Sequence, residues 1–515
     1  MERNHSHRPG PRGSSRGGGA GRPSQKAKPS REAPAAPSQG AGAPCPVYRK
    51  CGGCQLQNLE YPRQLVWKQD RCQKLLGRFG KVSPILGMEC PYHYRNKVQA
   101  AFAYDKRRGR IVSGVYQSST HKIVPVDSCQ TEDETADRII VSIRGLLKDF
   151  KLQAYDENTG RGFLRHVLVK RGFSTGQVMV VLVTGTPVFT AKKHFVAKLL
   201  ALHPEITTIL QNVNDKRTSL VLGEREKVLY GPGYIVDELC GCRFRISAKS
   251  FYQINPVQTE VLYTKAMEFA GLSGREKVLD AYCGIGTIGL VAAKHGAGQV
   301  LGVELNPDAV KDAIQNAKEN AMKNAWFTRG DAGEFLAQAA LERERWDVVF
   351  MDPPRAGASR EFLTALCACA PKRVVYISCD PETLSRDLGI LQANHYKIEQ
   401  IQPVDMFPHT QHIETVVLLS KGEVDSKKIR VEFSLEDMDM SEFQDGATYP
   451  QIKEYVLEHT GLKVSNLYIS QIKRKCGIEV GKNYNLPKSE DSRQPQCPPE
   501  KEKAIREAFK YYGMI

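Results

Sequence analysis

The chain has 515 residues, 41% of them hydrophobic, and its 73 Lys and Arg against 57 Asp and Glu give a formal net charge of +16. We find no apolar run near the roughly 18 residues of a membrane span, and the start MERNHSHRPG lacks the apolar core of a signal peptide. These features exclude a membrane protein and predict a cytoplasmic chain of several folded units, whose charge favours a polyanionic partner such as nucleic acid.

Residues 1–43 are rich in Gly, Pro, Ser and Arg and almost lack large apolar side chains. Such a segment buries too little surface to offset the entropy of ordering, so it predicts a disordered basic tail.

The segment 44–90 opens with a cysteine cluster, CPVYRKCGGC, which holds Cys45, Cys51 and Cys54, and VDSCQTED offers Cys129 as a distant fourth. A reducing cytosol argues against a disulfide framework for the fourteen cysteines, so we expect the cluster to bind metal. Zinc and an iron-sulfur centre would both accept four thiolates.

From about residue 91 to 250 the sequence consists of short alternating runs, which predict a mostly antiparallel β-rich domain with one helix near 131–149. The expected strands are VQAAFAYD, GRIVSGVYQ, HVLVKRG, VMVVLVTG, SLVLGE and CRFRISA. Basic and aromatic residues alternate in YHYRNK, DKRRGR and RGFLRH, as on an RNA-binding surface, although solvated strand faces have a similar composition.

From residue 251 to 422 short apolar strands alternate with helical periodicity, as in NPDAVKDAIQNAKENAMKN. The strands KVLDAY, QVLGVEL, WDVVFMD, RVVYISC and TVVLLSK predict a doubly wound, Rossmann-like α/β domain, whose ligands bind at the carboxyl ends of the strands. An acidic linker, 423–446, then leads to a helical C-terminal unit, 447–515, whose cationic stretch IKRKCG is either an RNA contact or a solvated face.

The sequence VLDAYCGIGTIGL places three glycines between a strand and a helix, with Glu304 at the end of the next strand. NAD and S-adenosylmethionine both suit such a loop. A negative charge on Asp280 is awkward for a pyrophosphate but acceptable for a sulfonium, and VVFMDPPRAGA resembles the substrate-side motif of Rossmann-like methyltransferases, so a methyltransferase is favoured over an oxidoreductase.

Three motifs, DPPRAG, YISCDP and FPHTQHIETV, stand in this order, and together they closely resemble the RNA 5-methyluridine methyltransferase family over about residues 45–420. The resemblance implies that Cys379 is the nucleophile that adds to carbon 6 of a flipped-out uracil, and that Glu414 is the base that removes the carbon 5 proton. It also implies cofactor contacts at Gln253, Tyr282, Thr287, Glu304, Asp331 and Asp352. Thr287 stands where many relatives have Asn.

The cysteine spacing resembles the branch of this family that carries a 4Fe-4S cluster and acts on ribosomal RNA. We therefore expect a monomeric enzyme that methylates a uridine of large-subunit (23S) ribosomal RNA, with Cys45, Cys51, Cys54 and Cys129 as cluster ligands. Many members of that branch begin with a small β-barrel, whereas this chain has the low-complexity residues 1–43. Transfer RNA as substrate, and a non-catalytic RNA-binding factor, are the alternatives.

Overall fold

The computed structural model describes residues 45–117, 120, 122–216, 220–422, 449–460, 462, 464–476, 478 and 497–511. They fall into two compact units, one within Met1–Val424 and one within Asp425–Ile515. The tail expected at 1–43 and the linker expected at 423–446 lie outside the described residues. We see no helix in the described ranges that is long and apolar enough to span a membrane.

The first unit begins with the short helix α1 (Tyr48–Cys51) and the long helix α2 (Tyr61–Leu76). A buried ion pair fixes α2, because Lys68 Nζ donates to Asp405 Oδ1 at 2.5 Å and to the Phe407 carbonyl at 3.0 Å. A buried charge is tolerated only when it is paired in this way. The cysteine-bearing segment is therefore attached to residues more than 330 positions further along the chain.

The central part of the first unit is a seven-stranded sheet in the order β3-β2-β1-β4-β5-β6-β7. All neighbours are antiparallel except β5 and β6, which are parallel and are connected through α4. The strands are β1 (Lys97–Asp105), β2 (Arg110–Tyr116), β3 (Ile123–Pro125), β4 (Leu164–Arg171), β5 (Val178–Thr184), β6 (Ile206–Val213) and β7 (Arg225–Tyr230). The mostly antiparallel pattern expected here is confirmed.

Two helices, α3 (Glu134–Asp149) and α4 (Lys192–Leu202), cover this sheet. The predicted helix near 131–149 is confirmed as α3, whose N-cap Asp133 accepts a hydrogen bond from the Ala136 amide at 3.0 Å. The buried face of α3 carries Ile139, Ile143 and Leu147, at the spacing of one helical stripe.

A hairpin of β8 (Ile235–Leu239) and β9 (Cys242–Ile246) leads from the central sheet to the α/β domain. Phe244 of this hairpin shares one continuous core with Met179 of the central sheet and Leu262 of the following helix. The two parts therefore share one core within the first unit.

The α/β domain has a second seven-stranded sheet in the order β12-β11-β10-β13-β14-β16-β15. Its strands are β10 (Lys277–Ala281), β11 (Gln299–Glu304), β12 (Ala325–Arg329), β13 (Val348–Met351), β14 (Arg373–Ser378), β15 (Tyr396–Val404) and β16 (Glu414–Lys421). The first five are parallel, whereas β16 runs antiparallel between β14 and β15. The five strands predicted here are confirmed as β10, β11, β13, β14 and β16.

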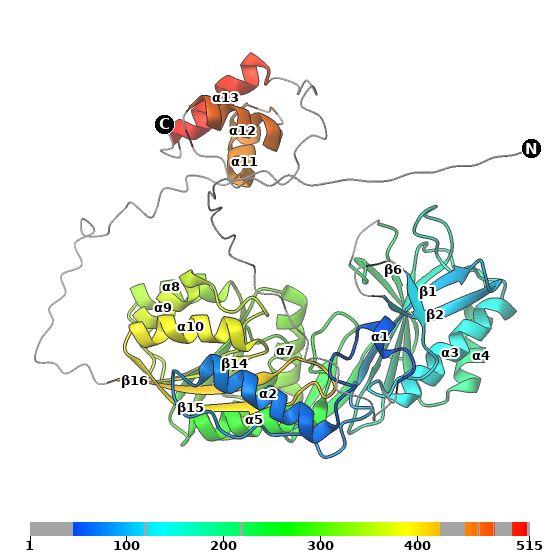
Figure 1. The fold of residues 1–515 in the computed structure, drawn as a ribbon, viewed down its shortest axis with the longest axis horizontal. Coiled ribbons are helices and arrows are strands. Elements are labelled where there is room, and N and C mark those ends of the chain that lie inside the picture. Colours follow the sequence, from blue (N-terminus) through cyan, green and yellow to red (C-terminus); the bar gives the residue numbers. More distant parts are fainter. Residues whose placement is uncertain are drawn as a thin grey trace, which may run out of the picture. The chain divides into compact units, whose positions relative to one another are not determined.

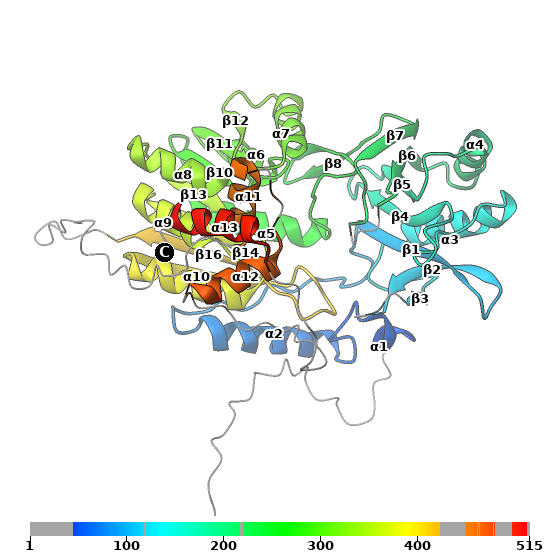
Figure 2. The ribbon, with the colours of Figure 1, turned by 90° about the horizontal axis from the view of Figure 1, so that it is seen from above.

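Helices flank both faces of this sheet, with α8, α9 and α10 on one side and α5 on the other (Figure 1). They are α5 (Pro256–Ala270), α6 (Thr287–Lys294), α7 (Pro307–Glu319), α8 (Ala332–Leu341), α9 (Arg360–Cys369) and α10 (Pro381–Ala393). Figure 2 shows α2 running alongside this domain, next to α10. The Rossmann-like α/β arrangement expected from the sequence is confirmed.

One predicted strand, SLVLGE, is wrong, because the described residues 220–224 form no strand and β7 begins only at Arg225. The amide of Asn214 donates to the carbonyls of Leu220 and Val221 at 2.7 and 3.0 Å. A side chain thus satisfies the loop carbonyls that a neighbouring strand would otherwise pair.

The second unit contains the helices α11 (Tyr449–Thr460), α12 (Asn466–Lys475) and α13 (Pro499–Tyr511). They share a small core that includes Ile452, Ile469 and Phe509. The two predicted helices are confirmed as α11 and α13, and the cationic stretch between them lies at the end of a third helix, α12.

Candidate active site

The loop between β10 and α6 forms one wall of the site at the carboxyl end of the parallel strands. Tyr282, Gly284 and Gly286 all have left-handed backbone conformations, with φ of 65°, 55° and 82°. A Cβ on Gly286 would lie 2.8 Å from the Phe327 ring, whereas one on Gly284 would meet nothing within 4 Å. The loop is therefore tightly packed at Gly286 and open at Gly284, where a ligand has room to approach the backbone.

Glu304, the last residue of β11, is hydrogen-bonded to this loop. Its Oε2 accepts from the Gly284 amide at 3.0 Å, and its Oε1 accepts from the Asn306 amide at 2.8 Å. Each carboxylate oxygen has two lone pairs, so each is able to accept a further hydrogen bond. Glu304 is thus held in place while remaining suited to the hydroxyls of a ribose.

The other expected cofactor residues lie along the same edge. Asp331 follows β12 and caps α8, accepting from the Gly333 amide at 2.8 Å. Burial, and after it the Asp331 charge, raises the pKa of Tyr282, so these two side chains are near each other. Thr287 Oγ1 lies 3.0 Å from the Tyr263 hydroxyl.

Gln253 is the remaining expected contact, and it lies before α5 with 9% of its surface exposed. Its carbonyl accepts a hydrogen bond from Asn96 Nδ2 at 3.1 Å.

Asp280 lies beneath the glycine loop and is fully buried. Its Oδ2 accepts from the Gly289 amide at 2.7 Å, and its Oδ1 has no hydrogen-bond partner among the described residues. Burial raises the pKa of Asp280 to about 8, against the lowering effect of the Gly289 amide. Burial thus favours the neutral form of this carboxyl over the negative charge expected from the sequence.

Asp352, Cys379 and Glu414 come together where three neighbouring strands meet. Asp352 follows β13, Cys379 follows β14, and Glu414 begins β16. In the antiparallel register Ser378 pairs with Thr415, which brings the next residues, Cys379 and Glu414, beside each other at the sheet edge. The strand order thus brings a thiol and a carboxyl together although they are 35 positions apart in the chain.

Burial and neighbouring charges raise the pKa values of both Cys379 and Glu414. Burial is the largest cause that raises the pKa of the Cys379 thiol to about 12, and the carboxyls of Glu414 and Asp352 follow. Burial, together with Asp352, also raises the pKa of Glu414 well above its ordinary value. In the ligand-free site burial and the neighbouring carboxyls thus favour the neutral forms of Cys379 and Glu414, and burial raises the pKa of Asp352 to about 7.

Arg355 counteracts the effect of these carboxyls on the pKa values. It was not predicted from the sequence as a site residue. Its guanidinium lowers the pKa values of both Cys379 and Glu414. It is exposed, with Nη2 2.6 Å from His412 Nδ1 and Nε 3.8 Å from Asp380 Oδ2. Its position inside the DPPRAG motif was the available signal, but an arginine in a polar loop usually indicates only a solvated surface.

The four expected cluster cysteines lie in one region of the first unit, close enough for their charges to influence one another. Burial raises the pKa of the Cys54 thiol to about 12, and the thiols of Cys129, Cys51 and Cys45 each raise it further, so all four lie within electrostatic range. In the described ranges, however, we find no group of three or more His, Cys, Asp or Glu side chains that is gathered closely enough to hold a metal ion. Four thiols are a suitable number and type of ligand for a 4Fe-4S cluster, but the described side chains do not form a metal-binding arrangement.

The segments around these cysteines pack against the loop that precedes Glu414. The Leu56 amide donates to the His409 carbonyl at 2.9 Å, and the Tyr94 hydroxyl donates to the Pro408 carbonyl at 2.9 Å. His409 Nε2 lies 3.0 Å from the Pro91 carbonyl. The cysteine region and the loop 405–413 therefore support one another.

Comparisons with known proteins indicate the family to which the chain belongs. The model of the tRNA (Uracil-5-)-methyltransferase family matches residues 224–422. An uncharacterised RNA methyltransferase of Halalkalibacterium halodurans is 44% identical over 382 residues, which cover 73% of this chain and 83% of the relative. Another from Clostridium acetobutylicum is 43% identical over 384 residues, with 73% and 83% covered.

A solved structure is also similar, that of Pyrococcus abyssi tRNA (uracil-54, C5)-methyltransferase in complex with S-adenosyl-L-homocysteine. It is 29% identical, with a TM-score of 0.59, and the match covers 71% of this chain and 85% of that one. From the fold, the identity and the extent of these matches, the chain is an RNA methyltransferase and belongs to the family of S-adenosylmethionine-dependent RNA uracil-5 methyltransferases.

Proposed function

We propose that this protein methylates carbon 5 of a specific uridine in large-subunit (23S) ribosomal RNA, with Cys379 as the nucleophile and Glu414 as the base. The observation that supports this proposal most strongly is the antiparallel register of β14 and β16, which puts a thiol and a buried carboxyl side by side at the ligand-binding edge of the sheet.

In the proposed reaction the Cys379 thiol loses its proton to solvent, and the thiolate sulfur forms a bond to carbon 6 of uracil as the carbon 5–carbon 6 double bond opens, which makes carbon 5 nucleophilic. S-adenosylmethionine, when bound, supplies the methyl group that carbon 5 accepts. Glu414 then removes the proton from carbon 5, and the sulfur–carbon 6 bond breaks to release the product. A carboxylate whose pKa is raised by burial is a stronger base once it is ionised, which suits Glu414 to this step.

The residues available to hold S-adenosylmethionine are Gln253, Tyr282, Thr287, Glu304, Asp331 and Asp352. The open backbone at Gly284 and the remaining acceptor capacity of Glu304 fit a nucleoside and an amino acid group. Arg355 has a positioning role, because its charge lowers the pKa of the thiol that must ionise.

We further propose that Cys45, Cys51, Cys54 and Cys129 bind a 4Fe-4S cluster with a structural role. Four thiolates are the usual ligands of such a centre. Because the Leu56 amide donates to the His409 carbonyl, a bound cluster would also stabilise the loop that precedes Glu414. The β-rich region 91–250 and the helical unit 447–515 are proposed to bind RNA, and the chain is proposed to act as a monomer in the cytoplasm.

Transfer RNA is the second candidate substrate, since the solved relative from Pyrococcus abyssi is a transfer RNA enzyme. Mapping of 5-methyluridine in ribosomal and transfer RNA from cells that lack the protein would distinguish the two. Loss of one site from 23S ribosomal RNA is the expected result, whereas loss only from transfer RNA would overturn the ribosomal assignment.

A further inference from the structure

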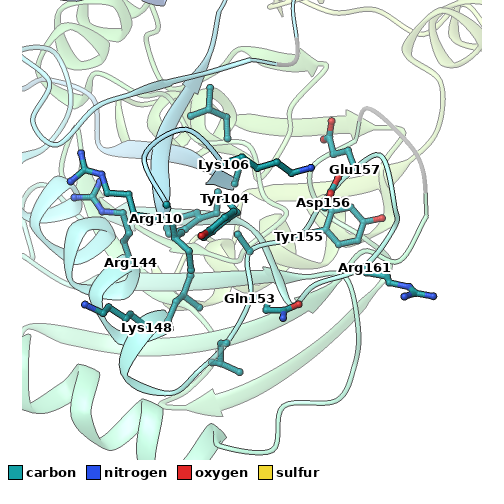
Figure 3. Close-up of a pocket in the computed structure, with 18 of the residues that line it drawn as sticks. Tyr104, Lys106, Arg110, Arg144, Lys148, Gln153, Tyr155, Asp156, Glu157 and Arg161 are labelled. Carbon is teal, nitrogen blue, oxygen red and sulfur yellow. The ribbon is translucent and has the colours of Figure 1, made fainter.

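A large open pocket lies in the central sheet region, and none of the residues assigned to methyl transfer or to the cysteine cluster lines it. Its volume is about 1610 Å³, and its walls come from the β1–β2 hairpin, α3 and the segment 151–161. Figure 3 shows Arg110, Arg144 and Lys148 on one side of the pocket and Arg161 on the other, with Tyr104 and Lys106 between them. The volume exceeds the roughly 300–1,000 Å³ of a typical small-molecule site, which favours a polymeric ligand.

The lining is strongly basic, with six Lys or Arg side chains against two acidic ones. Arg144 is neutralised by Asp127, whose Oδ1 accepts from Nη1 at 2.6 Å. The other five, by contrast, form no ion pair or side-chain hydrogen bond with any residue that the structure describes: Lys106, Arg110, Lys148, Lys151 and Arg161. Five cations that form no ion pair with a described residue, around a concave surface with a net positive charge, are suited to a phosphate backbone.

Two tyrosines add aromatic surface to the pocket. Tyr104 lies on β1 and is 56% exposed. Tyr155 is buried, and the guanidinium of Arg165 lies 4.6 Å from its ring centre. Tyr104 therefore has an aromatic face available for stacking, whereas Tyr155 is a fixed part of the wall.

We propose that this pocket binds a single-stranded segment of the RNA substrate, with its phosphates on the free cations and one base stacked on Tyr104. Single-stranded RNA combines the two features that the pocket matches, a regular negative charge and unpaired bases. The inference rests on an RNA substrate, as the proposed function does, but not on the identity of the uridine or on the chemistry of Cys379 and Glu414.

The test measures binding of a labelled single-stranded RNA of roughly 20 nucleotides, by fluorescence anisotropy at several salt concentrations. Lys106→Ala/Lys148→Ala should reduce the log-log salt slope by about 1.4 and weaken binding about 15-fold near 0.15 M salt, since each single-strand phosphate contact contributes about 0.7. The matched control is Lys193→Ala/Lys198→Ala, which removes two exposed lysines of α4 that do not line the pocket. The control should retain the affinity and the slope of the unaltered protein.

Tyr104→Ala separates stacking from charge. It should weaken binding about tenfold at every salt concentration and leave the salt slope unchanged, because stacking contributes roughly 1–3 kcal/mol per base and releases no counterions. The proposal is wrong if the two double-lysine variants bind RNA equally well, or if Tyr104→Ala binds with unaltered affinity. The pocket would then suit a protein or a small anion instead. The assay records binding alone, so it remains decisive if no 5-methyluridine is ever found.

Discussion

Replacement of Asp280 by asparagine should change how the stability of the protein depends on pH. Asp280 has no exposed surface, and burial raises its pKa to about 8 from an ordinary value near 4. The folded state holds this proton more tightly than the unfolded chain does. The contribution of Asp280 to the free energy of unfolding is therefore fully present below pH 4 and is lost as the pH rises towards 8.

The size of this effect follows from the pKa difference. Each pH unit inside the window costs about 1.4 kcal/mol, so the Asp280 contribution between pH 5 and pH 8 is roughly 4 kcal/mol. Asp280→Asn removes the titration and keeps an oxygen that is able to accept the Gly289 hydrogen bond, now 2.7 Å long. The variant should therefore lose less stability than the unaltered protein between these two pH values.

Urea unfolding at pH 5, 6, 7 and 8 measures this difference, and Asp347→Asn is the control, whose pH profile over this range should match that of the unaltered protein. The hydrogen bond from Lys372, followed by that from the Lys277 amide, holds the pKa of Asp347 below its ordinary value, so its carboxylate stabilises the fold above the unfolded pKa. An Asp280→Asn variant with the same pH profile as the unaltered protein would refute the assignment of a protonated, buried carboxyl beneath the loop.

Three further predictions concern the site, the cysteines and the C-terminal unit. Arg355→Gln should shift the acidic limb of the kcat/KM profile to higher pH, because the guanidinium lowers the pKa of Cys379, and an unshifted limb would contradict this role. Anaerobically purified protein should be brown and contain iron and sulfide, Cys54→Ser should lose both, and colourless protein with stoichiometric zinc would refute the cluster. Truncation at residue 422 should leave the first unit folded and reduce the salt slope of RNA binding by roughly 0.7–0.9 per lost contact, whereas an unchanged slope would exclude an RNA role for the second unit.

The sequence predicted those strands whose apolar residues form a clear run, but not those in which polar residues interrupt the run. β15 mixes apolar residues with charged and polar ones, contains Pro403 and has a bulge between Ile398 and Gln400, so it shows no continuous apolar run. β6 contains Gln211 and Asn212 near its end, and both are buried, where Gln211 donates to Thr184 and Asn212 donates to the Gly223 carbonyl. Such pairing depends on residues far away in the chain, which a local pattern does not contain.

The candidate site shows the same division. The resemblance of three motifs indicated Cys379 and Glu414 as a pair, but their adjacency depends on the insertion of β16 between β14 and β15, which no single motif specifies. The protonated state of Asp280 was missed for a related reason, because it arises from complete burial and the residue type alone indicates a charge. The ion pair of Lys68 with Asp405 is likewise visible only in three dimensions.

The central claim is that Cys379 forms a covalent bond to uracil and that Glu414 allows its release. Glu414→Gln, incubated with S-adenosylmethionine and the 23S ribosomal RNA transcript, tests this claim most directly on a denaturing gel. We predict a methylated RNA–protein adduct that accumulates in this variant and disappears in Cys379→Ala/Glu414→Gln. Normal turnover by Cys379→Ala, or full activity of Glu414→Gln without any adduct, would contradict the account.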